Sequence, residues 1–105
     1  MENIFCVKKA IEQCDNDEEF MHEMVGLFRD DLQECIELLT SAFKENNFKE
    51  LKELSHRIKG QAATLAANDL FEKSKSLEQE VFSETKYNDL MKSIKEFLEV
   101  SLDMP

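Results

Sequence analysis

Apolar residues recur every three or four positions through most of this chain, which is the spacing of amphipathic helices rather than of strands. Successive stretches carry this pattern, and they predict helices over residues 3 to about 14, 17 to 45, 48 to 67, 68 to 82 and 87 to 102. Short polar links separate the stretches, so successive helices should run antiparallel. We therefore expect an all-α fold: an antiparallel up-down-up-down four-helix bundle with an extra short N-terminal helix, forming a single domain over residues 1–105.

Polar residues just before the apolar stretches indicate where helices begin. Asn16 with Glu19, and Asn47 with Glu50, have the spacing of a capping box, in which two side chains satisfy free backbone amides at a helix start. Asn68 is a suitable N-cap for the fourth helix. These residues therefore predict the starts of the second, third and fourth helices.

The second helix is long and carries a wide apolar stripe. One set of its residues lies together on the helical wheel, and a second set widens the stripe to about half the circumference. The two sets are Phe20, Met24, Leu27, Phe28, Cys35, Leu38, Leu39 and Ala42, and then Met21, Val25, Leu32, Ile36 and Phe43. Packing of the first helix would explain this width, and an apolar surface left free for a partner is the alternative. The fourth helix is expected to bury Leu70, Phe71, Ser74, Leu77, Val81 and Phe82.

Charge and cysteine content narrow the classes of function. The formal net charge is −10, so the basic surface of a nucleic-acid-binding protein is absent, and an anionic membrane would repel this chain. No apolar run reaches the roughly 20 residues that span a bilayer. Cys6, Cys14 and Cys35 have no C-x-x-C spacing, and an odd count without a signal peptide indicates reduced thiols. We expect a cytoplasmic monomer.

The third stretch carries a histidine on the side opposite its apolar residues. Its apolar side is formed by Leu51, Leu54, Ile58, Ala62 and Leu65. His56 falls nearly opposite them, Lys59 is its neighbour on the next turn, and Gly60 and Ala63 leave the surface beyond the ring almost bare. A glycine inside a helix costs about 1 kcal/mol relative to alanine, so close approach of a partner explains Gly60 better than helix stability does. An exposed imidazole is a nucleophile, and the lysine would offset added negative charge. The pattern indicates a histidine that accepts a phosphoryl group and offers it to a docking partner.

A family resemblance starts at this histidine. The segment His56-Arg57-Ile58-Lys59-Gly60, followed by Ala63, Leu65, Leu70 and Leu77-Glu78, resembles the histidine-containing phosphotransfer (HPt) domain family. The family pattern is roughly H-x-L-K-G-x-x-x-x-[LIM]-G, followed by a helix with spaced leucines that ends in L-E. This chain departs from it at Gln61-Ala62, where a small polar pair is usual, and at Ala66, where glycine is usual.

The resemblance implies a four-helix bundle that relays phosphoryl groups between aspartates of response-regulator receiver domains. It makes His56 the phosphoacceptor and Lys59 the residue that stabilises the phosphoryl group, with Lys52 and Arg57 nearby. The partner-binding residues that it implies are Lys52, Arg57, Gly60 and Ala63. The expected partners are receiver domains and a hybrid sensor histidine kinase.

The sequence lacks the motifs for ATP binding, kinase activity and di-iron binding. There is no Gly-rich phosphate loop and no kinase signature, so we expect a phosphoryl carrier that neither binds ATP nor phosphorylates itself. Glu53 and His56 have the Glu-x-x-His spacing of di-iron bundles, but no second pair exists and His56 points outward, so no metal or other cofactor is expected. Two alternatives stay open: a binding-only bundle that docks a receiver or kinase domain without phosphotransfer, and the terminal domain of a larger hybrid sensor kinase.

Overall fold

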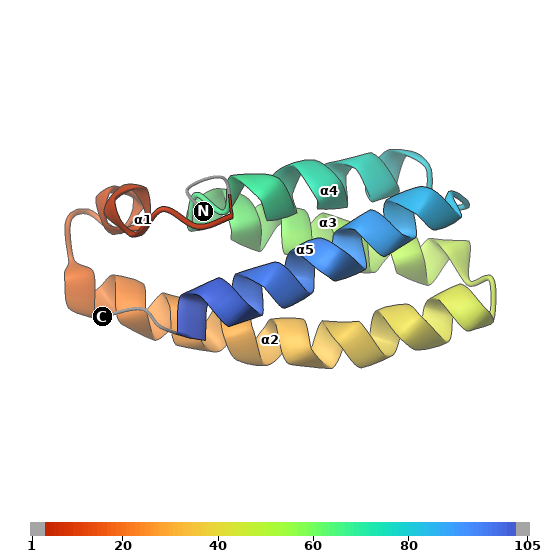
Figure 1. Cartoon of the computed structure of the whole chain (residues 1–105), viewed down its shortest axis with the longest axis horizontal. Coiled ribbons are helices and arrows are strands. Elements are labelled where there is room, and N and C mark those ends of the chain that lie inside the picture. The colour runs from red at the N-terminus through yellow and green to blue at the C-terminus, as the bar shows by residue number, and fades with distance from the viewer. Residues whose placement is uncertain (1–3, 103–105) are drawn as a thin grey trace.

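Helices account for most of residues 4–102, the part of the chain that a computed structural model describes (Figure 1). They are α1 (Val7–Gln13), α2 (Glu18–Lys44), α3 (Phe48–Thr64), α4 (Asn68–Gln79) and α5 (Glu84–Leu102). No strand occurs within that range, so the prediction of an all-α fold is confirmed. Residue 3, the predicted start of the first helix, lies outside the described residues.

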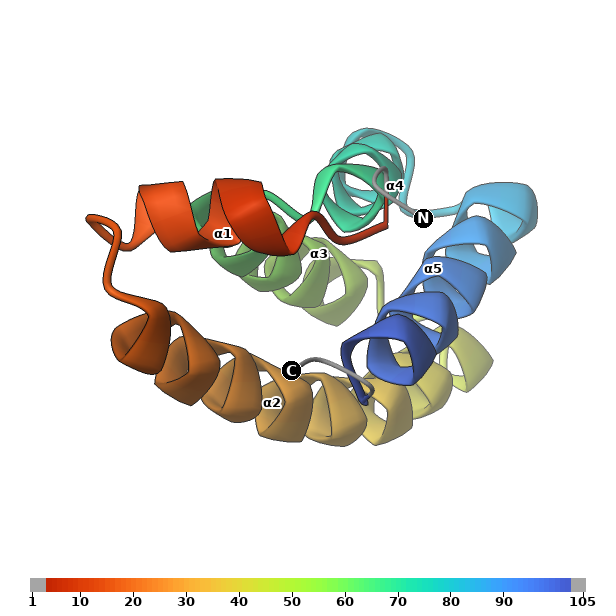
Figure 2. The ribbon, with the colours of Figure 1, turned by 60° about the vertical axis from the view of Figure 1, so that its left-hand side comes forward.

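The four longer helices alternate in direction along the long axis of the molecule (Figure 1). α3 packs most extensively against α4, α4 packs against α5, and α2 contacts both α3 and α5. The four helices therefore surround one core in a body of 41 × 20 × 20 Å. α1 lies at the end of this body where α3 ends and α4 begins, as two views show (Figures 1 and 2).

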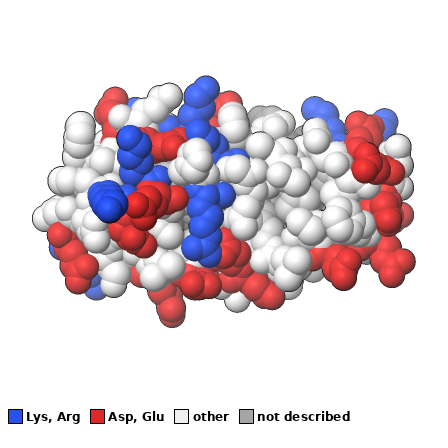
Figure 3. All heavy atoms as spheres, turned by 180° about the vertical axis from the view of Figure 1, so that it is seen from behind, with Lys and Arg blue, Asp and Glu red and all other residues white. Residues whose placement is uncertain are grey.

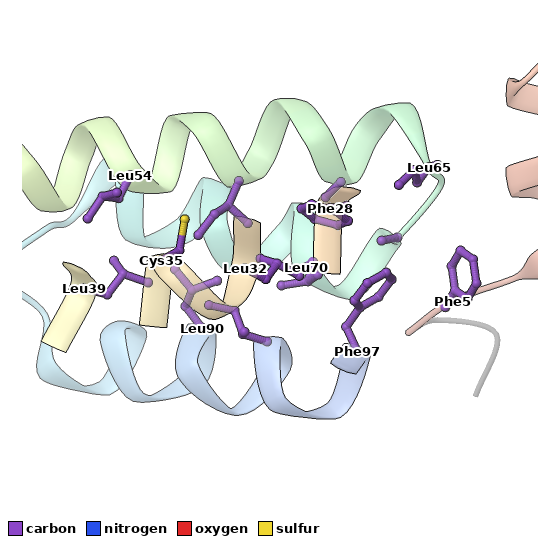
Figure 4. Close-up of a cluster of buried hydrophobic side chains, with 14 of the residues drawn as sticks. Phe5, Phe28, Leu32, Cys35, Leu39, Leu54, Leu65, Leu70, Leu90 and Phe97 are labelled. Atoms are coloured by element: carbon purple, nitrogen blue, oxygen red, sulfur yellow. The ribbon is translucent and has the colours of Figure 1, made fainter. Parts of the chain in front are cut away.

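The core runs along the axis between the helices (Figure 4). Aliphatic side chains fill its length, and aromatic rings close the end near α1. There the ring of Phe97 packs edge-on against Phe5, with centroids 5.3 Å apart. It also packs against the tilted ring of Phe28, at 5.2 Å. The prediction that the first helix includes residues 4–6 is wrong, because α1 begins at Val7. Phe5 lies before α1 in non-helical backbone, and its ring is buried against Phe97.

Side-chain hydrogen bonds cap the starts of α2 and α3. Asn47 caps α3 as predicted, because its side chain accepts a hydrogen bond of 3.1 Å from the backbone amide of Glu50. The prediction of Asn16 as the cap of α2 is wrong, since Asp17 accepts the bond from the amide of Phe20. Asn16 instead has φ 61°, a left-handed conformation that asparagine tolerates in the turn before the helix.

The link between α3 and α4 begins earlier in the chain than predicted. α3 ends at Thr64 rather than near residue 67, because Ala66 turns the chain with φ 55°. Asn68 is the first residue of α4 and not its cap, and the capping position falls on Ala67, which has no side-chain bond to offer. The carboxylate of Asp69 accepts a hydrogen bond from Ser93 of α5, so it joins the two helices instead.

Part of the predicted apolar surface stays exposed. α2 buries Met21, Val25, Phe28, Leu32, Cys35, Leu39 and Ala42, so the centre of its stripe faces the core. Leu27 is 62% exposed and Phe20 is 46% exposed, so the packing of α1 does not cover the whole stripe. The prediction that Phe82 is buried is also wrong: α4 ends at Gln79, and Phe82 is 72% exposed in the turn that follows.

Candidate functional site

His56 projects from the outer side of α3. The core-facing side of this helix is fixed by the burial of Leu51, Leu54, Ile58 and Ala62. His56 lies on the opposite side, and 70% of its side chain is exposed. Its neighbour Ser55 is buried and donates a hydrogen bond to the carbonyl of Leu51, so the backbone that carries the imidazole is held against the core.

The carboxylate of Glu78, on α4, contacts two of the residues that the sequence singled out on α3. One of its oxygens lies 2.7 Å from Nδ1 of His56, and the other accepts a hydrogen bond of 2.6 Å from Nζ of Lys59. Only 15% of the Glu78 side chain is exposed. We call these three residues the His56–Glu78–Lys59 bridge.

The charge state of Glu78 decides how the imidazole is held. The pKa of Glu78 is lowered chiefly by the hydrogen bond from Lys59; burial opposes this, and the contact with His56 adds to it. Glu78 is therefore ionised at neutral pH and can only accept hydrogen bonds. Nδ1 of His56 must then be the donor, which leaves the lone pair of the neutral ring on Nε2.

Small residues extend the exposed side of α3 beyond the ring. A Cβ atom placed on Gly60 would meet nothing within 4 Å, so tight helix packing does not account for this glycine. Ala63, one turn further on, is also exposed. The side of α3 beyond the ring therefore carries no large side chain at these two positions.

Lys52 and Arg57 have different surroundings. Lys52 lies with Glu53 and Glu78 around a shallow hollow beside His56. Arg57 turns toward α2, where its Nε donates a hydrogen bond of 3.1 Å to Asp31 and its Nη2 contacts the other carboxylate oxygen. This ion pair raises the pKa of Arg57 and ties α3 to α2. The structure thus gives Arg57 a partner within the chain.

An apolar groove lies between α2 and α3 on the Gly60 side of His56. It is lined by Met24, Leu27, Phe28, Gln61, Thr64 and Leu65. Oε1 of Gln61 is buried there and accepts no hydrogen bond from any residue that the structure describes. Viewed from the α3 side, the molecule has a band of Lys and Arg side chains with a broad uncharged area beside it (Figure 3).

Two features of this site were missing from the sequence-based prediction. Glu78 was noted only as part of the terminal Leu-Glu of the family pattern, because helical periodicity cannot say which residues of two helices meet. Gln61 was noted only as a departure from that pattern.

Among residues 4–102 there is no group of three His, Cys, Asp or Glu side chains that could hold a metal ion. No helix in this range is long and apolar enough to cross a membrane.

Comparison with known proteins identifies the family. The family model described as Hpt domain matches residues 23–102, which include all of α3, α4 and α5 and most of α2. No curated protein and no solved structure matches the chain. The chain belongs to the Hpt domain family, whose members act in phosphotransfer in two-component signalling.

Proposed function

We propose that this chain is a phosphorelay carrier in which His56 takes a phosphoryl group from the aspartyl phosphate of one receiver domain and passes it to the aspartate of another. The observation that carries this proposal is the contact between Nδ1 of His56 and Glu78, which leaves Nε2 as the free nucleophile on an exposed ring. A binding-only bundle would need neither an oriented imidazole nor a lysine on the same carboxylate.

The transfer balances without an added reagent. Nε2 of His56 attacks the phosphorus in line, a P–N bond forms, and the P–O bond to the aspartate breaks with its electron pair leaving on that carboxylate. Nδ1 keeps its proton, so the ring becomes a cation as the bond forms. Transfer to a second receiver reverses these steps, and positioning supplies most of the rate.

The two charged neighbours divide the work. Glu78 would stabilise the positive charge that develops on the ring, since its oxygen lies 2.7 Å from Nδ1. Lys59 would offset the negative charge of the phosphoryl group. Because Lys59 and His56 contact opposite oxygens of one carboxylate, the ammonium is already held beside the ring before the partner arrives.

The docking surface that we propose covers the outer side of α3. Lys52, Gly60 and Ala63 lie on it, and the receiver would extend over the apolar groove between α2 and α3. A hydrogen-bond donor of the receiver would satisfy Oε1 of Gln61. The prediction that Arg57 binds a partner stays part of this proposal, and the receiver would then compete with Asp31.

The remaining sequence-based predictions belong to the same proposal. The alternating directions of α2 to α5 support an antiparallel up-down-up-down four-helix bundle as the domain architecture, with α1 as the extra helix (Figure 1). We propose that residues 1–105 act as one cytoplasmic, monomeric domain. Its partners would be receiver domains and a hybrid sensor histidine kinase.

The test is to incubate the chain with receiver domains from the same genome, each phosphorylated beforehand with acetyl phosphate. Mass spectrometry under alkaline conditions should locate the phosphate on His56, and His56→Gln should remove it. Most of the ring is exposed, and the amide of glutamine can still donate a hydrogen bond to Glu78, so circular dichroism should show an unchanged fold. Phosphate that persists in His56→Gln, for example on His22, would refute the assignment.

A further inference from the structure

Two exposed aromatic rings meet at the end of the molecule away from α1. Phe48 is the first residue of α3, and Phe82 lies in the turn between α4 and α5. Their ring centroids are 6.2 Å apart in an edge-on arrangement, although Phe48 is 42% exposed and Phe82 is 72% exposed. We call these two residues the aromatic pair.

The turn that carries Phe82 is braced. The side chain of Ser83 accepts a hydrogen bond of 3.2 Å from the backbone amide of Lys86, and Nζ of Lys86 lies 3.1 Å from a carboxylate oxygen of Glu80. The exposed ring is therefore presented by an ordered turn, so little entropy is lost when a partner covers it.

The aromatic pair is continuous with the surface around His56. Phe48, Lys52 and His56 follow at four-residue intervals, so they lie along one side of α3. Phe82 lies four residues after Glu78, in the turn that follows the end of α4. The hollow beside His56 is also lined by Lys52 and Glu53, which lie between His56 and Phe48 along α3, so the hollow is on the Phe48 side of the imidazole.

The distance involved fits a single interface. Phe48 precedes His56 by eight residues, which is about 12 Å along a helix. A protein–protein interface of standard size covers about 800 Å² on each partner, equivalent to a disc of roughly 16 Å radius. A receiver domain that brings its aspartate to His56 therefore covers Phe48 if its footprint is centred on the histidine.

We propose that the aromatic pair is a second anchor for the receiver domain, separate from the groove on the Gly60 side. The receiver would place an aliphatic or aromatic side chain against the edge of Phe82 while its acidic phosphorylation site faces Lys52 and Lys59. Buried aromatic residues dominate the binding energy of many interfaces, and this pair is uncovered in the free chain. The anchor rests on the proposed function and adds a determinant of which receiver binds.

The test replaces Phe82 with serine and measures phosphoryl transfer from the phosphorylated receiver that labels the parent chain fastest. An anchor that binds equally before and during the reaction affects KM alone. We expect KM to rise at least tenfold, with kcat within twofold and an unchanged melting temperature. Leu102→Ser is the matched control, because Leu102 is 70% exposed at the other end of α5 and should leave KM unchanged.

A small phosphodonor separates this inference from the proposed function. Phosphoramidate needs no docking surface, so it should label the parent and Phe82→Ser equally. If the parent works with the receiver and Phe82→Ser keeps its KM, the anchor is refuted and the relay stands. If Phe82→Ser keeps its KM but abolishes a dimer of the parent in analytical ultracentrifugation, the pair binds a second copy and the anchor is again refuted. If no receiver labels the parent, both proposals fail.

Discussion

Replacing Glu78 with alanine removes the carboxylate that contacts both His56 and Lys59. The expected result is slow phosphorylation of a folded protein. Nδ1 of His56 loses its acceptor, so the ring can rotate and can carry its proton on either nitrogen. Lys59 also loses the partner that keeps it beside the ring.

The size of the effect follows from the contact at 2.7 Å between Nδ1 and Glu78. A hydrogen bond to a charged group contributes about 1.5–3 kcal/mol, and here it strengthens as the ring becomes a cation. If it acts in the transition state, its loss slows the reaction roughly 10- to 150-fold. Because 70% of the His56 side chain is exposed to water, we expect the lower half of that range. Glu78→Gln keeps a neutral acceptor and should lie between the parent and Glu78→Ala.

Single-turnover labelling of the parent, Glu78→Ala and Glu78→Gln with phosphoramidate measures this step without a docking partner. Glu72→Ala is the matched control. It removes the same charge from α4, and Glu72 is exposed and forms no ion pair among the residues that the structure describes. Imidazole ¹⁵N NMR of the unphosphorylated proteins reports which ring nitrogen carries the proton. Equal labelling rates for all four proteins, with the proton of His56 on Nδ1 in each, would show that the bridge has no role in phosphotransfer.

Three further predictions concern stability and access. Gly60→Gln should raise the free energy of unfolding by up to about 1 kcal/mol, and so melt at the same or a higher temperature, yet lose most transfer from a receiver. Gly26→Gln, at an equally open position on α2, is the control and should gain stability while keeping transfer. A destabilised Gly60→Gln would contradict this prediction. Ala66→Gly should leave the free energy of unfolding unchanged or raise it by up to about 1 kcal/mol, because glycine adopts the left-handed conformation of residue 66 (φ 55°) without strain. Ala67→Gly, at φ −85°, should lower the free energy of unfolding. Equal losses for the two variants in urea denaturation would refute this reasoning. The pKa of Glu78 is lowered from 4.5 in the folded state, so its stabilising contribution is present above pH 4.5 and is lost as the pH falls through the lower pKa of the folded protein. In urea denaturation at acid pH, the free energy of unfolding should therefore fall less steeply for Glu78→Gln than for the parent.

The sequence predicts best what is decided within one helix. The start of α3 at Asn47 and the outward direction of His56 both follow from residues less than two turns away. The choice between Asn16 and Asp17 as a cap also lies within the sequence, but both residues suit that position. The left-handed conformation of Asn16 in the preceding turn decides in favour of Asp17.

Contacts between helices are harder to predict. Periodicity identifies Leu77 as buried, but the partner of its neighbour Glu78 depends on how far α4 slides along α3. A different limit explains the wrong prediction for Phe82: the apolar pattern of α4 continues past Gln79, where the helix ends. Phe5 is a third case, since its burial depends on the distant ring of Phe97.

The site is a product of the packing between α3 and α4. His56 directly follows the fully buried Ser55, and Glu78 directly follows the fully buried Leu77. Each functional side chain therefore stands at the edge of a core contact, and the 2.7 Å between them records the register of the two helices. One turn of slippage along a helix amounts to about 5.4 Å, which would separate the imidazole from its acceptor. The apolar residues that hold α3 against α4 are thus also what orients the nucleophile, although none of them contacts it.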